Sequence, residues 1–161
     1  MSGFIVLLRH GIAEDRSEDK PDADRKLTDV GKRRMKKIAK TLARIFPEAE
    51  ALYSSPLVRA VETSQAVEKA YGGEIRTETT ELLEPGADVA DFRRLLADTK
   101  SQFAIFVGHE PNLTEIMLDL TAMRSHNAIE LKKGGCYGLR IEDNSILLEW
   151  MLPPRILRED E

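Results

Sequence analysis

The run Phe4-Ile5-Val6-Leu7-Leu8-Arg9-His10-Gly11 joins an apolar segment directly to a polar one. Its apolar half, Phe4 to Leu8, is typical of a strand buried on both faces, as strands of parallel sheets are. An arginine and a histidine follow this strand at once, and a glycine after them permits a turn. A second run of the same kind, Phe103 to Val107, leads into Gly108-His109. The sequence therefore predicts two buried strands that each end beside a histidine.

Segments with helical periodicity lie between these two runs. Thr28 can cap a helix from about Asp29 to Phe46, in which apolar residues recur at helical spacing. Ala51 to Ser54 indicates a second, short strand. Pro56 suits the first position of the next helix, which we expect to end near Tyr71, before two glycines.

The second half of the chain continues the alternation of strands and helices. Glu74 to Thr79 is a third strand candidate, Asp88 can cap a further helix, and another helix is expected after Pro111. Two final strands, near Cys136 to Ile141 and from Ser145 to Leu152, would form a hairpin. Strand–helix alternation is the pattern of a parallel sheet covered on both faces. We therefore predict an α/β fold, a three-layer sandwich with a mostly parallel central sheet, helices on both faces and an antiparallel edge hairpin, in a single domain over residues 1–161.

The composition limits the class of protein. The chain has 161 residues and a formal charge of −4, which argues against nucleic acid or an anionic membrane as the main partner. Its single cysteine, Cys136, rules out an internal disulfide and favours an intracellular setting. The apolar runs are too short for a signal peptide or a membrane span. We therefore expect a cytoplasmic protein.

Three candidate functional segments follow predicted strands. Arg9-His10 follows the first strand, Ser55-Pro56 with Arg59 follows the second, and His109 follows the strand that starts at Phe103. In parallel α/β sheets, ligands bind beyond the carboxyl ends of the strands. Arginines and histidines gathered there would suit a phosphoryl group, because arginine can bind phosphate oxygens through two N–H groups. A neutral imidazole beside them could attack phosphorus and form a covalent intermediate. With three histidines and neither a His-x-x-x-His nor a Cys-x-x-Cys pair, the sequence indicates no metal set and no cofactor.

Together these motifs resemble the histidine phosphatase superfamily, also called the phosphoglycerate mutase-like fold. The resemblance extends from about residue 4 to 152 and is carried by Leu8-Arg9-His10-Gly11, by Ser55-Pro56-Leu57-Val58-Arg59-Ala60 with the nearby Thr63, and by Gly108-His109. The short chain, Leu27-Thr28-Asp29-Val30-Gly31 and Glu81-Leu82-Leu83-Glu84-Pro85-Gly86 are similar to the SixA-type phosphohistidine phosphatase branch.

The resemblance implies a role for individual residues. His10 would be the nucleophile, and Arg9 and Arg59 would bind phosphoryl oxygens. His109 would be the second pocket histidine and donate to the phosphoryl group. Arg25 matches a basic position of SixA-like chains and would help to bind substrate, the alternative being a solvated loop charge.

The general acid is left open. Larger members of the family place a carboxylate in this pocket, whereas SixA-like members are thought to lack a clear acid. Glu81 is preferred among the candidates because it follows the third strand, with a capping or loop role as the alternative. Glu84 and Glu14 are weaker candidates. His126 lies in a polar stretch and is expected at the surface.

The expected function is a metal-independent phosphatase with a phosphohistidine intermediate, acting on phosphohistidine in a partner protein. The chain has no inserted cap between Gly86 and Phe103 that could enclose a small metabolite, which favours a protein substrate. One alternative is a phosphomonoesterase for a small phosphate ester. Another is a phosphate-binding module without turnover. The sequence does not indicate the oligomeric state.

Overall fold

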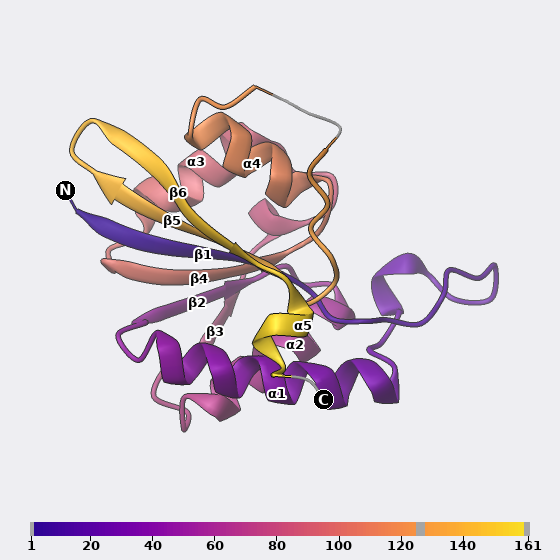
Figure 1. The fold of residues 1–161 in the computed structure, drawn as a ribbon. Helices are drawn as coiled ribbons and strands as arrows, with labels where there is room; N and C mark the ends of the chain where they lie inside the picture. Colours follow the sequence, from indigo (N-terminus) through magenta and orange to yellow (C-terminus); the bar gives the residue numbers. More distant parts are fainter. Residues whose placement is uncertain (1, 125–127, 160–161) are drawn as a thin grey trace.

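A six-stranded sheet lies at the centre of the computed structural model, which describes residues 2–124 and 128–159 (Figure 1). The strands are β1 (Gly3–Arg9), β2 (Ala51–Ser54), β3 (Thr77–Thr79), β4 (Phe103–Gly108), β5 (Cys136–Glu142) and β6 (Ser145–Leu152). They lie in the order β3-β2-β4-β1-β5-β6. β1 to β4 are parallel, and β5 and β6 form an antiparallel hairpin at one edge. The predicted mostly parallel sheet with an antiparallel edge is confirmed.

Helices cover both faces of this sheet, which confirms the three-layer arrangement. The helices are α1 (Asp29–Ile45), α2 (Val58–Ala70), α3 (Val89–Asp98), α4 (Asn112–Leu120) and the short α5 (Pro154–Leu157), with 3-10 helices η1 (Asp22–Asp24) and η2 (Glu81–Leu83). Figure 1 shows α1, α2 and α5 on one side of the sheet and α3 and α4 on the other. In the described part of the chain, no helix combines the length and the apolar character needed to cross a bilayer.

The first strand separates two apolar cores. Successive residues of a strand point to opposite faces, so Val6 and Leu8 pack toward α1 and α2, whereas Ile5 and Leu7 pack toward α3 and α4. All four side chains are buried. This burial on both faces explains why the strand is apolar without alternation.

Some helix boundaries follow the predicted signals and others do not. Thr28 caps α1 by accepting a hydrogen bond from Gly31 N at 3.0 Å, as expected. The prediction that Pro56 opens α2 is wrong, because Leu57 has extended backbone angles and the helix begins at Val58. The third strand also begins later than expected, at Thr77, since the chain is still turning after α2, with Glu74 N bonded to the Tyr71 carbonyl at 3.1 Å.

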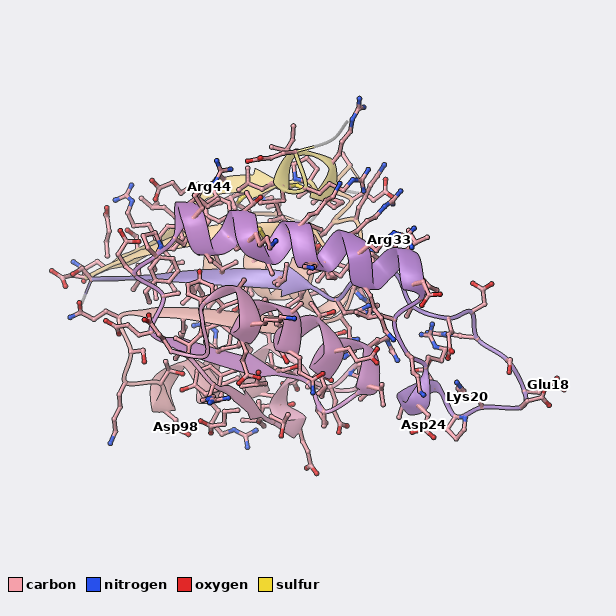
Figure 2. The ribbon with its side chains drawn as sticks, turned by 90° about the horizontal axis from the view of Figure 1, so that it is seen from below. Glu18, Lys20, Asp24, Arg33, Arg44 and Asp98 are labelled. Atoms are coloured by element: carbon pink, nitrogen blue, oxygen red, sulfur yellow. The ribbon has the colours of Figure 1, made fainter. Side chains whose placement is uncertain are left out.

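The strand register places the functional segments side by side. Arg9 of β1 pairs with Gly108 of β4, and Ser54 of β2 pairs with Val107. The residues immediately after these strands therefore emerge at the same end of the sheet. A long loop between β1 and α1 lies at this end as well. Figure 2 shows Glu18, Lys20 and Asp24 of this loop projecting beyond the Arg33 end of α1.

Candidate active site

The two histidines that follow β1 and β4 lie next to each other. His10 N donates to the Gly108 carbonyl at 3.1 Å, which continues the strand pairing by one residue. The rings of His10 and His109 have their centroids 5.2 Å apart. Both side chains are buried, with exposed fractions of 5% and 3%. The structure thus brings together two imidazoles that lie 99 positions apart in the sequence.

The tautomer of His10 follows from one hydrogen bond. Nδ1 of His10 lies 2.7 Å from the carbonyl oxygen of Gly11. A carbonyl oxygen can only accept, so Nδ1 carries the proton and Nε2 of the neutral ring keeps its lone pair. Arg59 Nε donates to that Nε2 at 3.3 Å. The lone pair of His10 is therefore directed toward the guanidinium that could hold an anion.

Thr63 ties the turn after β1 to the start of α2. Gly11 N donates to Thr63 Oγ1 at 3.0 Å, and Thr63 Oγ1 donates to the Arg59 carbonyl at 2.7 Å. Gly11 must be a glycine, because a Cβ there would lie 2.5 Å from Cγ of Met35. These contacts fix His10 and Arg59 relative to each other.

Asp22 of η1 lies between two arginines of the site. Its carboxylate accepts from Arg59 Nη2 at 3.0 Å and from Arg25 Nε at 2.9 Å, and its carbonyl accepts from Arg59 Nη1 at 2.8 Å. Arg25 also donates to the Glu14 carbonyl at 2.7 Å and is only 9% exposed. The alternative of a solvated loop charge for Arg25 therefore does not fit. Asp22 lies where two guanidinium groups converge, and a phosphoryl group would have to share or replace its contacts.

His109 completes the pocket on the side of β2. Its Nε2 lies 2.8 Å from Ser55 Oγ. Its Nδ1 is buried and has no hydrogen-bond partner among the described residues. A buried polar atom without a partner costs free energy, and a bound oxyanion would provide one if the ring carried a proton on Nδ1.

Arg9 is the last residue of β1 and directly precedes His10, but one end of its guanidinium is bound to the loop before β5. Its Nη1 donates to the Leu131 carbonyl at 2.7 Å, and its buried Nε has no partner among the described residues. Its positive charge is nevertheless near enough to lower the pKa of both His10 and His109.

The environment keeps both histidines neutral at physiological pH. Burial is the main cause that lowers the pKa of His10 to about 3, and the positive charges of His109, Arg59 and Arg9 add to it. Burial also lowers the pKa of His109 to about 4, with Arg59 as the next cause. A neutral His10 has the lone pair that a nucleophile requires.

None of the candidate general acids forms a hydrogen bond or ion pair with His10, Arg59 or His109 in the described structure. Glu81 is exposed at the start of η2, and no hydrogen bond or ion pair in the described structure joins its carboxylate to His10, Arg59 or His109. Glu84 lines a small cavity together with His109. The Glu14 carboxylate bonds to Lys20 Nζ at 2.7 Å, and this bond lowers its pKa, which disfavours the protonated form that an acid needs.

Sequence reasoning missed Asp22. Its one local signal is an arginine three residues later, but the same loop contains Asp15, Asp19 and Asp24, and nothing in the pattern distinguishes them. Within residues 2–124 and 128–159, no group of three or more His, Cys, Asp or Glu side chains is arranged to hold a metal ion. His126, expected at the surface, lies outside the described residues.

Comparison with known proteins identifies the class. The sequence model of the histidine phosphatase superfamily (branch 1) matches residues 5–85. An uncharacterized protein of Picosynechococcus sp. strain PCC 7002 is 32% identical over 92% of this chain and 99% of its own length. The chain therefore belongs to the histidine phosphatase superfamily and is a phosphatase.

Solved structures place the fold within this superfamily. A protein assigned as the phosphohistidine phosphatase SixA of Agrobacterium tumefaciens has a TM-score of 0.81 at 23% identity, covering 94% of this chain and 98% of that one. The protein histidine phosphatase SixA in complex with tungstate has a TM-score of 0.78 at 20% identity, covering 96% of this chain and 99% of that one. These likenesses confirm the predicted phosphoglycerate mutase-like fold.

Proposed function

We propose that this phosphatase hydrolyses phosphohistidine on a partner protein through a phosphohistidine intermediate on His10. The observation that carries the proposal is the hydrogen bond of 2.7 Å between His10 Nδ1 and the Gly11 carbonyl. It fixes the tautomer in which Nε2 is unprotonated and can attack once it releases the hydrogen bond from Arg59 Nε. The neighbouring Arg59 guanidinium, 3.3 Å from Nε2, lies where the phosphoryl group would be held.

In the first step, Nε2 of His10 forms a bond to phosphorus while the bond from phosphorus to the substrate's ring nitrogen breaks. The leaving imidazole takes a proton from solvent and departs neutral. Charge on the equatorial oxygens is stabilised by the guanidinium groups of Arg59, Arg25 and Arg9 and by His109. Such positioned donors supply most of the catalysis in phosphoryl transfer, so the site needs no metal in this scheme.

In the second step, a water oxygen bonds to phosphorus and the bond from His10 Nε2 to phosphorus breaks. The proton lost by the water passes to the phosphate product or to solvent, and His10 returns to the neutral tautomer. The same arginines and His109 hold the phosphoryl oxygens in both steps. Glu81 remains the preferred acid for a substrate with a poorer leaving group.

A protein substrate is supported by the course of the chain near the pocket. Between η2 and β4 the chain forms α3, which packs against α4 rather than adding a separate cap. Asn112 Nδ2 holds the preceding loop by donating to the carbonyls of Pro85 at 3.1 Å and Ala87 at 2.6 Å. A histidine on another protein's surface could therefore approach the site from the strand ends.

Labelling and turnover test this proposal together. We expect the wild type to hydrolyse free phosphohistidine with chelator present and to trap an acid-labile, alkali-stable phosphoryl group on rapid quench. His10→Ala should lose both turnover and the label, with Lys100→Gln as a folded control. Turnover by His10→Ala would contradict the covalent mechanism. Phosphate binding without any turnover by the wild type would favour the binding-module alternative, and a preference for small phosphate esters would favour the phosphomonoesterase.

A further inference from the structure

A basic groove opens beside Arg9, at the same end of the sheet as His10. It has a volume of about 600 Å³. Its walls come from the first half of α1, the loop before β5 and the segment that contains α5. β5 and β6 run antiparallel to each other, and Cys136 pairs with both Leu8 and Leu152. This register explains why the loop and α5 lie at the carboxyl end of β1.

The groove concentrates positive charge in a chain whose net charge is −4. Six arginine and lysine side chains line it, and Glu130 is the one acid among the described lining residues. Four of these cations are exposed and form neither a side-chain hydrogen bond nor an ion pair with any described residue, namely Arg34, Lys132, Lys133 and Arg155. Like charges gathered without counter-charges repel one another, so an anionic partner would stabilise them.

The backbone joins this groove to the nucleophile. Gly134 N donates to the carbonyls of both Arg9 and His10 at 3.1 Å, and Arg9 N donates to the Gly135 carbonyl at 3.0 Å. Gly134 has a φ of +84°, a backbone conformation that strains any residue other than glycine. The loop that carries Lys132 is thereby held at a fixed position relative to His10.

We infer that this groove is the docking surface for an acidic face of the phosphorylated substrate protein. The inference rests on the proposed function and specifies its partner. Acidic side chains that flank the phosphohistidine would meet Arg34, Lys132, Lys133 and Arg155. Ile156, which is 61% exposed in the same groove, offers an apolar contact. The concave shape of the groove favours a protein surface over a flat membrane.

Two peptides with flanking residues of opposite charge test the docking surface. Each contains one histidine phosphorylated chemically with phosphoramidate, flanked in one peptide by glutamate and leucine and in the other by lysine and leucine. The two groove variants are Lys132→Gln/Lys133→Gln and Arg34→Gln/Arg155→Gln. The control, Lys69→Gln/Lys100→Gln, removes the same charge in the last turn of α2 and before β4, at the opposite end of the sheet.

We expect the wild type to prefer the acidic peptide, and each groove variant to lower kcat/KM for it about tenfold, with smaller losses at high salt. The value for free phosphohistidine should stay within about twofold of wild type, because this substrate has no acidic flanks to contact the groove. The value for the lysine peptide should stay unchanged or rise, because the variants remove like charges that repel it. Equal kcat/KM for both peptides in the wild type, or equal losses in groove and control variants, would overturn the inference.

A binding measurement separates this inference from the proposed function. The glutamate peptide without phosphate, labelled with fluorescein, should bind the wild type and the control with the same Kd and the groove variants about tenfold more weakly. If the wild type hydrolyses none of the phosphohistidine substrates, the proposed function fails. The Kd comparison still shows whether the groove binds an acidic peptide. Stronger binding to anionic vesicles or to DNA than to the peptide, lost in the groove variants, would overturn the acidic-protein partner.

Discussion

Asp22 and Arg59 are joined by two hydrogen bonds, one from each terminal nitrogen of the guanidinium. Nη2 lies 3.0 Å from the Asp22 carboxylate, and Nη1 lies 2.8 Å from the Asp22 carbonyl oxygen. A guanidinium presents its N–H groups as a planar fork that also suits two phosphate oxygens. Under the proposed function, the aspartate therefore occupies donors that the phosphoryl group would use, and it places a negative charge beside that group.

Replacing Asp22 with Asn should strengthen the binding of phosphate. The change removes the charge that opposes a dianion but keeps an oxygen that can accept from Arg25 or Arg59. Because the Asp22 side chain is 43% exposed, we expect a gain of at most about 1 kcal/mol, or about fivefold in the inhibition constant for inorganic phosphate. Inhibition assays at constant ionic strength measure this constant. A weaker affinity would instead show that the Asp22 charge is needed to position Arg59.

Arg59→Ala should reduce kcat by roughly a hundredfold, because it removes a charged donor that faces the developing charge, a loss of about 3 kcal/mol. Arg59→Lys should recover part of the loss, since lysine keeps the charge but lacks the fork. Steady-state assays on free phosphohistidine provide the comparison. If Arg59→Ala changed KM alone, Arg59 would bind the ground state and the transition state equally.

Glu81→Gln should be mild on phosphohistidine and more severe on an alkyl phosphate. The P–N bond is weak and its imidazole can leave after protonation by solvent, whereas an alkoxide needs a positioned acid. Parallel kcat/KM measurements on the two substrates test this, with Glu84→Gln as the matched variant. Large and equal losses on both substrates would assign Glu81 to structure or phosphate binding. No loss on either would remove it from the mechanism, in line with its exposed position.

Acid should destabilise the fold through its two buried histidines. Their folded-state pKa values are lowered to about 3 for His10 and about 4 for His109, whereas a histidine in the unfolded chain titrates near about 6.5. Below that pH the unfolded chain binds protons that the folded chain does not, so stability is lost as the pH falls from about 6.5 toward 4 and then 3. Each histidine should cost about 2 kcal/mol at pH 5 relative to pH 7.5.

Urea unfolding at the two pH values measures this dependence. Between pH 7.5 and pH 5, the free energy of unfolding of His109→Gln should fall by about half as much as that of the wild type, because one of the two titrating histidines is removed. An unfolding free energy that does not change between these pH values would show that the two histidines are not held neutral in the folded protein.

The main elements could be predicted because their signals are local. The apolar runs before His10 and His109 mark strands buried on both faces, and Thr28 marks the start of α1 by its cap. The same local signal misled at Pro56, because a proline favoured at the first helical position is equally compatible with the extended turn that precedes α2. The short α5 was not predicted, since a helix of four residues that begins at the second of two prolines is too short to show helical periodicity.

The candidate site was predictable only in part, because local signals place some of its residues while contacts between distant segments place the others. His10, Arg59 and His109 could be placed at strand ends, and the parallel register then brings them together. The hydrogen bond of Arg9 to the Leu131 carbonyl joins residues 122 positions apart, and no local pattern predicts it. The position of Asp22 depends on a loop that folds back onto α2, and no sequence pattern specifies that return.

The position of β4 between β1 and β2 has a consequence for how the protein is synthesised. His10 follows β1 and Arg59 follows β2, yet these strands have no direct pairing, and the strand that bridges them begins only at Phe103. A nascent chain that has not yet emerged beyond this point cannot close the sheet or contribute His109. The pocket that holds His10, Arg59 and His109 is therefore assembled late, when β4 inserts between two strands already made. Under the proposed function, a ribosome-bound N-terminal half would lack the means to attack phosphorylated proteins around it.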